Sequence, residues 1–413
     1  KRLYKYMLLD DQITGAQVCM LLFEQNIIDG TDEEKQAVQS GSKSAYSFML
    51  EKIENLDITP AQLALDPCSG SCVVTDTQTG EVLALVTYPG YDNNRLTNSI
   101  DSDYYNKIYY DLSQPMWNYA TQQLSAPGST FKMVSAATAL ENNVVGLNET
   151  ITCKGTWDTL SPPARCWIAP NGSHGPLDIS GAIEHSCNYF FYEVGYRLSR
   201  NNGVYDSDTG LEKLAYYADQ FGLSDKSGVE ISESAPKVSD FDAIRSAIGQ
   251  GTNNYSTVGL ARYVTTVANS GNCYNLSLLS KATDADGNLI ADYTPTLRNT
   301  VDLRQSTWDA IHQGMRKVVE DKDYYKDLTI QVAGKTGTAQ ENRKRANHAL
   351  FVCYAPYEQP QIAIATRIAF GYASDYAAQV TKDIVKYYFK LEDESSLITG
   401  TAESTNVVQS AGD

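Results

Sequence analysis

The chain has 413 residues, which is enough for one large domain or two ordinary domains with a sizeable hydrophobic core. Its formal net charge of −17 argues against nucleic acid as a partner, and no run of ~18 apolar residues of the kind that spans a bilayer occurs. The sequence opens on KRLYKYMLLDD, with neither an initiator Met nor a signal peptide, so we expect a segment of a longer protein.

Residues 1–57 are predicted to form a charged, mostly helical segment, because ITGAQVCMLLFEQ carries apolar residues at helical spacing. The composition changes near Thr59 and Pro60. Residues 71–90 then place β-branched residues on both sides of a DTQTG turn, which predicts a β-hairpin. Residues 101–260 are predicted to be mixed and mostly helical.

Three further strands and a long amphipathic helix are predicted toward the C-terminus. The strands are TIQVAGKTGTAQ, HALFVCYAPY and QPQIAIATRIAF, and the helix is YASDYAAQVTKDIVKYYFK. Residues 391–413 are polar and aperiodic, so we expect a disordered tail. Strands at both ends of residues 58–390, with helices between them, favour an α+β fold. We expect one antiparallel sheet flanked by helices, with an inserted helical subdomain.

Three short motifs, SxxK, SxN and K[ST]G, each occur more than once. SxxK begins at Ser40, Ser129 and Ser234; SxN begins at Ser186, Ser199, Ser270 and Ser404; K[ST]G begins at Lys226 and Lys335. Context selects among them: Ser129 follows a Pro-Gly pair and precedes the helical run MVSAATAL, with Lys132 one turn later. Ser186 and Asn188 open the run CNYFFYEVGY, and Lys335 lies in a predicted strand of small residues.

This arrangement predicts a nucleophilic serine with a lysine base. A serine hydroxyl is a poor nucleophile until a base accepts its proton, and a buried lysine such as Lys132, beside a second cation, can act as that base. Lys335 would supply the second cation and attract a substrate carboxylate, while Ser186 could relay protons. The N–H groups of Ser129 and Thr338 are candidates for an oxyanion hole. The competing interpretation is that Ser129 only caps a helix.

A second candidate site combines three cysteines and a histidine within 35 residues: Cys153, Cys166, His174 and Cys187. Three thiolates and an imidazole suit a closed, tetrahedral structural Zn²⁺ site, although the spacings exceed those of a zinc finger. A Cys153–Cys166 disulfide and buried apolar cysteines are the alternatives.

Longer stretches around these motifs resemble the transpeptidase domain of class B penicillin-binding proteins. They are DTQTGEVLALVTYPGYDNN, APGSTFKMVSA, HGPLDISGAIEHSCNYFFYEVG, SAIGQGTNNYSTVGLARYVTTVANSG and AGKTGTAQ, and they span roughly residues 60–388. The form SCNYFFYEVG, following an HG, looks most like the elongation-type branch from Gram-positive anaerobes.

The resemblance implies a peptidoglycan D,D-transpeptidase. Ser129 would attack the bond between the terminal D-alanines of a stem peptide, and β-lactams would acylate the same serine. The residues matched to catalysis are Ser129, Lys132, Ser186, Asn188 and Lys335, and those matched to substrate binding are Thr336, Gly337 and Thr338. The resemblance also favours Zn²⁺ at the cysteine–histidine cluster, where it would support the SxN loop. It implies no organic cofactor.

The resemblance further implies a place in the cell. Family members act in cell-wall synthesis and cell shape at the extracytoplasmic face of the membrane, and they are β-lactam targets in antibiotic resistance. Residues 1–57 would then be a remnant of the family's pedestal domain, without the membrane anchor, and the expected partner is a membrane glycosyltransferase. The alternatives are a β-lactamase, a D,D-carboxypeptidase and a non-catalytic β-lactam sensor. Stem-peptide preference and oligomeric state stay open.

Overall fold

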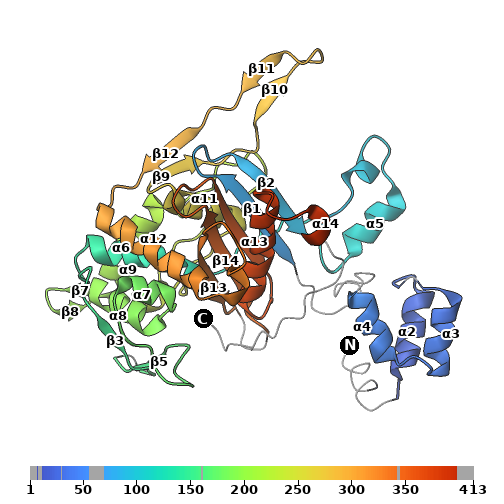
Figure 1. Cartoon of the computed structure of the whole chain (residues 1–413), viewed down its shortest axis with the longest axis horizontal. Helices are drawn as coiled ribbons and strands as arrows, with labels where there is room; N and C mark the ends of the chain where they lie inside the picture. The colour runs from blue at the N-terminus through green and yellow to red at the C-terminus, as the bar shows by residue number, and fades with distance from the viewer. Residues whose placement is uncertain are drawn as a thin grey trace. The chain divides into compact units, whose positions relative to one another are not determined.

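The computed structural model describes residues 7, 12–28, 30–54, 69–159, 161–341 and 345–397 (Figure 1). The chain divides into two compact units. One comprises Lys1–Cys68, Tyr110–Ser113 and Glu392–Asn406, and the other comprises Ser69–Tyr109, Gln114–Leu391 and Val407–Asp413. The predicted boundary near Thr59 and most of the predicted tail lie outside the described residues.

Residues 12–54 of the smaller unit form three short helices, α2 (Gly15–Glu24), α3 (Asp32–Ser40) and α4 (Ala45–Glu54). Thr14 and Thr31 begin α2 and α3 with capping boxes, so the local sequence sets both helix starts. The buried apolar residues of this unit are Cys19, Phe23, Ile28, Val38 and Phe48. The described part of residues 1–57 is therefore mostly helical, as the apolar spacing predicts.

The larger unit is built on a five-stranded antiparallel sheet in the order β13-β14-β15-β1-β2. The strands are β1 (Gly70–Asp76), β2 (Val82–Tyr88), β13 (Ala333–Ala339), β14 (His348–Ala355) and β15 (Ile362–Ile368). β1 pairs with β15 from Gly70↔Ile368 to Asp76↔Ile362, so segments distant in sequence close the sheet. Every residue of β14 is buried, which explains its almost continuous apolar run. The predicted α+β fold is confirmed.

Helices cover both faces of this sheet (Figure 1). α11 (Thr257–Ala268) packs against β15 and β1, and all twelve of its residues are buried. A hydrogen bond of 2.6 Å between the hydroxyls of Thr75 and Thr265 ties β1 to this helix. α13 (Ser374–Tyr388), the long amphipathic helix predicted near the C-terminus, packs against β14 and β15 on the opposite face of the sheet.

A helical subdomain is inserted between β2 and β13 in the sequence. Its main helices are α6 (Lys132–Glu141), α7 (Ile179–Glu184), α8 (Asn188–Leu198), α9 (Ser207–Gln220) and α12 (Gln305–Glu320). α12 packs against both α7 and β13 and thereby joins the subdomain to the sheet.

The remaining elements are short. They are η1 (Asn93–Leu96), α5 (Ser102–Tyr110), η2 (Gly128–Phe131), β3 (Ile151–Cys153), β4 (Thr156–Trp157), β5 (Ala164–Arg165), β6 (Gly175–Leu177), β7 (Arg200–Asn201), β8 (Val204–Tyr205), α10 (Ala243–Ser246), β9 (Asn272–Asn275), β10 (Lys281–Thr283), β11 (Leu289–Asp292), β12 (Thr296–Thr300), η3 (Asp323–Tyr325) and α14 (Glu394–Leu397). β3 pairs with β6 and β4 with β5, and these two small ladders hold the cysteine-rich segment.

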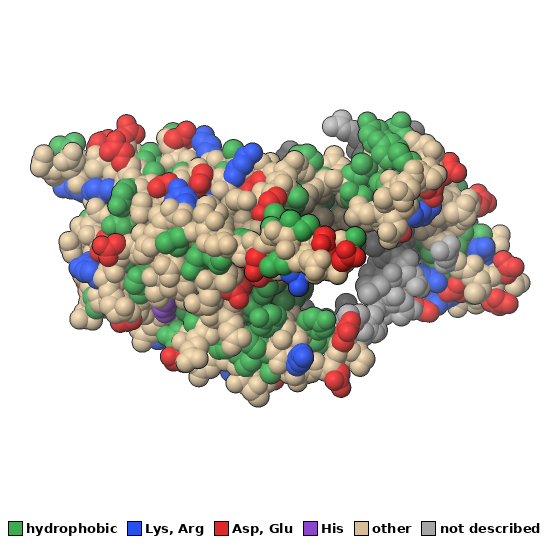
Figure 2. Space-filling model, turned by 90° about the horizontal axis from the view of Figure 1, so that it is seen from above, with side chains coloured by type: hydrophobic (Ala, Val, Ile, Leu, Met, Phe, Trp, Pro, Cys, Tyr) green, Lys and Arg blue, Asp and Glu red, His purple; other side chains and the backbone are tan. Residues whose placement is uncertain are grey.

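The surface carries mixed charge. Figure 2 shows acidic side chains spread over the face in view, with basic side chains between them, in keeping with the net charge of −17. Among the described residues, no helix has the length and hydropathy needed to cross a bilayer.

Candidate active site and metal centre

Ser129 lies in the tight turn η2, immediately before α6, and only 2% of it is exposed. It caps neither element, because the caps are Pro127 for η2 and Phe131 for α6. The capping interpretation is therefore wrong. Gly128 has φ +53°, and a Cβ there would lie 2.9 Å from the carbonyl carbon of Thr338. Only glycine allows this turn to approach β13 so closely.

Lys132, the first residue of α6, is fully buried and joins the SxxK and SxN motifs. Its Nζ donates hydrogen bonds to Ser186 O at 2.7 Å, Ser186 Oγ at 3.1 Å and Asn188 Oδ1 at 2.7 Å. Lys132 Nζ also lies 5.5 Å from the centre of the Phe191 ring. Three oxygen acceptors around one buried amine fix its direction, and one of them is a hydroxyl that can pass on a proton.

The SxN loop links α7 to α8 and is fixed on both sides. Ser186 has φ +48°, a strained conformation for a residue other than glycine. Its N–H donates to Ile183 O at 3.1 Å, and the next N–H, of Cys187, donates to Ala182 O at 2.9 Å. Cys187 then caps α8, because its Sγ accepts the N–H of Phe190 at 3.4 Å. Contacts of the neighbouring residues therefore stabilise the strained backbone conformation of Ser186.

Lys335 lies on β13, the edge strand of the described sheet, and is fully buried. Its Nζ donates to Thr336 O at 3.1 Å and approaches Thr336 Oγ1 at 3.4 Å. A Cβ on Gly337 would lie 2.7 Å from Thr130 Cγ2 and 3.0 Å from Pro127 O. The KTG strand therefore presses on the turn that carries Ser129, and the structure brings the three selected motifs together.

The two other copies of SxxK make ordinary structural contacts. Ser40 ends α3, and its hydroxyl bonds Ala37 O and Ser42. Ser234 Oγ donates to Gln122 O at 2.8 Å, and Lys237 pairs with Asp240. Context around each motif, not the motif count, made the choice possible.

A polar cleft of about 470 Å³ adjoins the motifs. Asn188 and Thr338 form part of its wall, together with Gln250 of the turn that follows α10. In this turn Gly249 accepts the N–H of Gly128 at 3.1 Å, so it packs directly on the Ser129 turn. Sequence reasoning missed two arginines in the same wall, Arg165 and Arg245. Little in the sequence points to these arginines, because each is an isolated residue next to a stretch that was selected for a different role.

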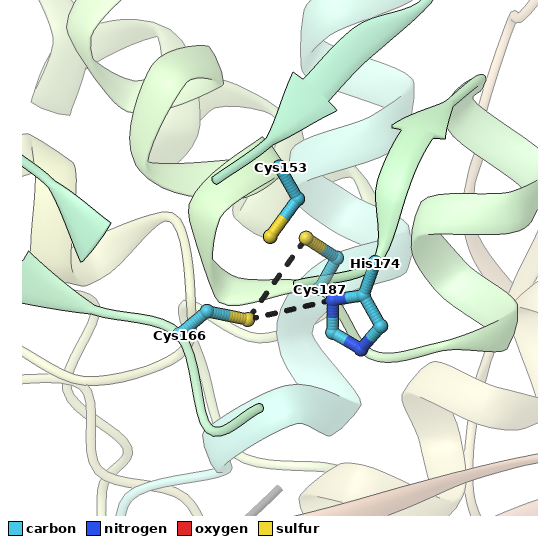
Figure 3. A group of neighbouring side chains, drawn as sticks. All are labelled: Cys153, Cys166, His174 and Cys187. Carbon is cyan, nitrogen blue, oxygen red and sulfur yellow. Dashed lines mark hydrogen bonds between the residues drawn. The ribbon is translucent and has the colours of Figure 1, made fainter. Parts of the chain in front are cut away.

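The four predicted metal ligands, three buried cysteines and the half-buried His174, form one cluster (Figure 3). Their ligand atoms all lie within 4.8 Å of one another, although β3 supplies Cys153, the β5–β6 connection supplies Cys166 and His174, and the α7–α8 loop supplies Cys187. Cys166 Sγ lies 3.7 Å from His174 Nδ1 and 4.0 Å from Cys187 Sγ. Hydrogen bonding with Cys187 lowers the pKa of both Cys166 and Cys153. All described cysteines are free, so no Cys153–Cys166 disulfide forms.

The donor set fits a tetrahedral metal ion. With Zn–S bonds of about 2.3 Å, two sulfurs in a tetrahedron lie roughly 3.8 Å apart, close to the separations observed here. Soft thiolates with one imidazole favour Zn²⁺ over harder ions. His174 Nε2 is buried and has no hydrogen-bond partner among the described groups, while Nδ1 faces the sulfurs (Figure 3).

An antiparallel sheet with a serine, a buried lysine and a KTG edge strand in contact defines the class of penicillin-recognising serine enzymes. The family described as the penicillin binding protein transpeptidase domain matches residues 70–386. The chain belongs to this family. Its relatives confirm the class B, elongation-type resemblance read from the sequence.

Two curated relatives illustrate the similarity. The peptidoglycan D,D-transpeptidase MrdA of Haemophilus influenzae is 30% identical over 362 residues, covering 78% of this chain and 53% of the relative. MrdA of Escherichia coli is 27% identical over 359 residues, covering 79% of this chain and 55% of the relative. The chain therefore spans about half the length of the curated relatives it matches.

Solved structures share the fold. Pseudomonas aeruginosa PBP2, in complex with WCK 5153, superposes with a TM-score of 0.67 at 26% identity, over 83% of this chain and 79% of that one. Penicillin-binding protein A of Mycobacterium tuberculosis, an imipenem acyl-enzyme complex, gives a TM-score of 0.69 at 22% identity, over 87% of each chain.

Proposed function

We propose that this chain is the catalytic part of a peptidoglycan D,D-transpeptidase that β-lactams acylate at Ser129. The observation that carries the proposal is the set of hydrogen bonds from Lys132 Nζ to Ser186 and Asn188, next to the Ser129 turn and the KTG strand. The MrdA relatives, which are named for this activity, support it.

In the acylation step, Ser129 Oγ attacks the carbonyl between the terminal D-alanines, and its proton passes to Lys132 as the neutral amine. The N–H groups of Ser129 and Thr338 stabilise the developing oxyanion. As the C–N bond breaks, the proton moves through Ser186 Oγ, 3.1 Å from Lys132 Nζ, to the leaving amine. An amine of a second stem then attacks the ester, and its proton returns to Ser129 by the reverse route.

Substrate binding is assigned to β13. An extended peptide can pair with the edge of β13 that no described strand occupies, as peptides do with other sheet edges. The positive charge of Lys335 and the hydroxyls of Thr336 and Thr338 suit the terminal carboxylate, and Gly337 leaves room for the peptide backbone.

A transpeptidase is favoured over a β-lactamase or a D,D-carboxypeptidase by the absence of a base for hydrolysis. The cleft beside Asn188 and Thr338 has no acidic residue among the described residues of its wall. Water in the cleft therefore lacks a carboxylate to activate it, and an amine acceptor, which is the better nucleophile, attacks first. Complete catalytic motifs argue against a non-catalytic sensor.

The first test is intact-mass spectrometry after brief exposure to benzylpenicillin, followed over hours, with Ser129→Ala alongside. A single adduct that persists in the native protein and is absent from the variant supports the proposal. An adduct that disappears within seconds while the drug is consumed identifies a β-lactamase. With no adduct in the native protein, the catalytic assignment fails.

We also propose that Cys153, Cys166, His174 and Cys187 hold a structural Zn²⁺. The ion would supply a rigid cross-link among β3, the β5–β6 connection and the α7–α8 loop. Because Cys187 lies between Ser186 and Asn188, its ligation would hold the SxN loop in place. A chelator should lower both the melting temperature and the acylation rate, and metal analysis finding under about a tenth of an equivalent would exclude the ion.

The cellular context is proposed from the family. We infer that residues 1–57 belong to the family's pedestal region and that the protein works at the extracytoplasmic membrane face with a glycosyltransferase. One solved structure similar to this chain concerns the structural coordination of polymerization and crosslinking by a peptidoglycan synthase complex. Co-purification of the full-length protein with a membrane glycosyltransferase tests the partnership.

A further inference from the structure

The cleft beside Asn188 and Thr338 has a basic wall in an acidic protein. Arg165 and Arg245 both line it, and no Asp or Glu is found among its described lining residues. Arg245 pairs with Asp242, which leaves further guanidinium N–H groups unused, because arginine has five donors. Among the described residues, Arg165 has no ion-pair partner. Arg165 and Arg245 together carry two positive charges, and Asp242 neutralises only one of them. The wall of the cleft is therefore positively charged, although the net charge of the chain is −17.

Each arginine is held by a structured backbone. Arg165 ends β5, where it pairs with Thr156, and its carbonyl accepts the hydroxyl of Tyr192 at 3.4 Å. Tyr192 lies one helical turn after Asn188 on α8, so it and Asn188 share a helix face. Arg245 lies in α10, whose N-cap Asp242 accepts the Arg245 N–H at 3.1 Å. The backbone of both arginines is therefore fixed in position beside the same cleft.

The direction of β13 says which part of a substrate enters this cleft. Side chains alternate along a strand, so Thr336, Thr338 and Gln340 lie on one side, and Thr338 and Gln340 line the cleft. If the terminal carboxylate binds at Lys335 and Thr336, an antiparallel peptide advances ~3.4 Å per residue toward Gln340. The proposed oxyanion hole places the carbonyl of the residue before last at the Thr338 N–H, so the third residue from the end lies one position further along the strand, between Thr338 and Gln340.

Resting on the proposed function, we infer that Arg165 and Arg245 bind a carboxylate on the side chain of the third stem residue. The preferred donor is then a stem that carries a diamino-dicarboxylic acid of the meso-diaminopimelate type at this position. A lysine there would bring an ammonium toward two guanidiniums. Guanidinium groups bind carboxylates through paired, charge-assisted hydrogen bonds, which gives the site its chemical selectivity.

The test compares three acyl donors of the form acetyl-X-D-alanyl-thioglycolate. X is meso-diaminopimelate, its side-chain amide or lysine, so the first two differ only in the carboxylate. Release of thioglycolate, followed by chromatography, gives kcat/KM for each donor. We expect the carboxylate donor to exceed the other two by about tenfold, the effect of one charge-assisted contact at a partly exposed site.

Variants assign the effect to the arginines. In Arg165→Gln/Arg245→Gln the preference for the carboxylate over its amide should fall below about twofold, while Arg200→Gln, an exposed arginine on β7, should keep it. A second donor pair has lysine at X preceded by γ-D-glutamate or by its α-amide. A carboxylate preference in that pair, with none in the first, would move the contact to the second residue and overturn the assignment.

Two failures can be told apart. If benzylpenicillin forms no stable adduct, the proposed function fails. If benzylpenicillin acylates Ser129 normally and the three donors react alike, only the arginine site fails. A carboxylate preference that survives in the double variant would likewise exclude Arg165 and Arg245 as its cause. The comparison of donors on the wild-type protein needs no variant, so the inference can be refuted even if the double variant misfolds.

Discussion

Gly249 packs on the turn that carries the catalytic serine, and replacing it with alanine tests how tightly that turn must be held. Gly249 has φ +77°, and a Cβ there would lie 2.6 Å from the carbonyl carbon of Gly128 and closer still to its oxygen. The same glycine accepts the N–H of Gly128 at 3.1 Å. The added methyl therefore pushes directly on the peptide that precedes Ser129.

The expected magnitude has two parts. Alanine at positive φ costs about 1–2 kcal/mol wherever it occurs. At Gly249 the methyl must also move about 1.5 Å away from the Gly128 carbonyl oxygen to reach the 3.4 Å of ordinary contact. A displacement of about 1 Å at a nucleophile can cost ~10²-fold in rate. Gly287, with φ +86° and nothing within 4 Å of an added methyl, carries the strain without the clash.

We therefore expect Gly249→Ala to acylate with benzylpenicillin about 100-fold more slowly than wild type, whereas Gly287→Ala keeps the wild-type rate. Second-order acylation rates come from intact-mass time courses. Melting temperatures from calorimetry measure the loss of stability that alanine at positive φ causes in both variants. Acylation of Gly249→Ala within twofold of wild type would refute the argument. An equal loss in Gly287→Ala would show that strain alone, not the contact with Gly128, slows the reaction.

Three further outcomes are expected. Asn188→Ala removes one of three acceptors from the buried lysine ammonium, so benzylpenicillin acylation should fall 10- to 100-fold by mass spectrometry, and an unchanged rate would contradict the site geometry. Cys187→Ser should lower both zinc content and melting temperature, whereas Cys273→Ser, buried outside the cluster, should keep the zinc; equal zinc in both would contradict the metal centre. The hydrogen bond from Arg197 lowers the pKa of Glu149 from 4.5, so its stabilisation is present above about pH 4.5 and is lost as pH falls through the lower folded-state pKa. Glu149→Gln should then melt lower than wild type at pH 7, by less than about 1 kcal/mol because the pair is partly exposed, and this difference should shrink as pH falls below about 4.5.

The sheet could be predicted because its strands are unusual in composition. The buried strand β14 has no polar face, and the hairpin of β1 and β2 is marked by its DTQTG turn. The ladders β3–β6 and β4–β5 could not be predicted, because strands of two or three residues show no period. Their pairing follows from the cysteine cluster and the surrounding core, which are contacts that only the folded chain contains.

The catalytic motifs were chosen from several copies by the glycine before Ser129, the helix after Ser186 and the small residues around Lys335. Each of these is a local signal with a physical cause. The arginines had no such signal, since Arg165 and Arg245 are 80 positions apart and neither belongs to a motif. Their meeting depends on how α8, α10 and β5 pack around one cleft, and this information is tertiary. The Gram-positive anaerobe resemblance stays a prediction.

The cysteine–histidine cluster connects the catalytic motifs with the two arginines. Cys187 is bonded in sequence to Ser186 and Asn188, and Cys166 directly follows Arg165. One cluster therefore holds both the loop that orients the catalytic lysine and a residue proposed to select the substrate. Ser186 keeps its strained φ only while its neighbours are fixed, so loss of the cluster should disturb the lysine contacts and the carboxylate preference together. Chelation that abolished one and spared the other would show that the loop and the basic wall are held independently.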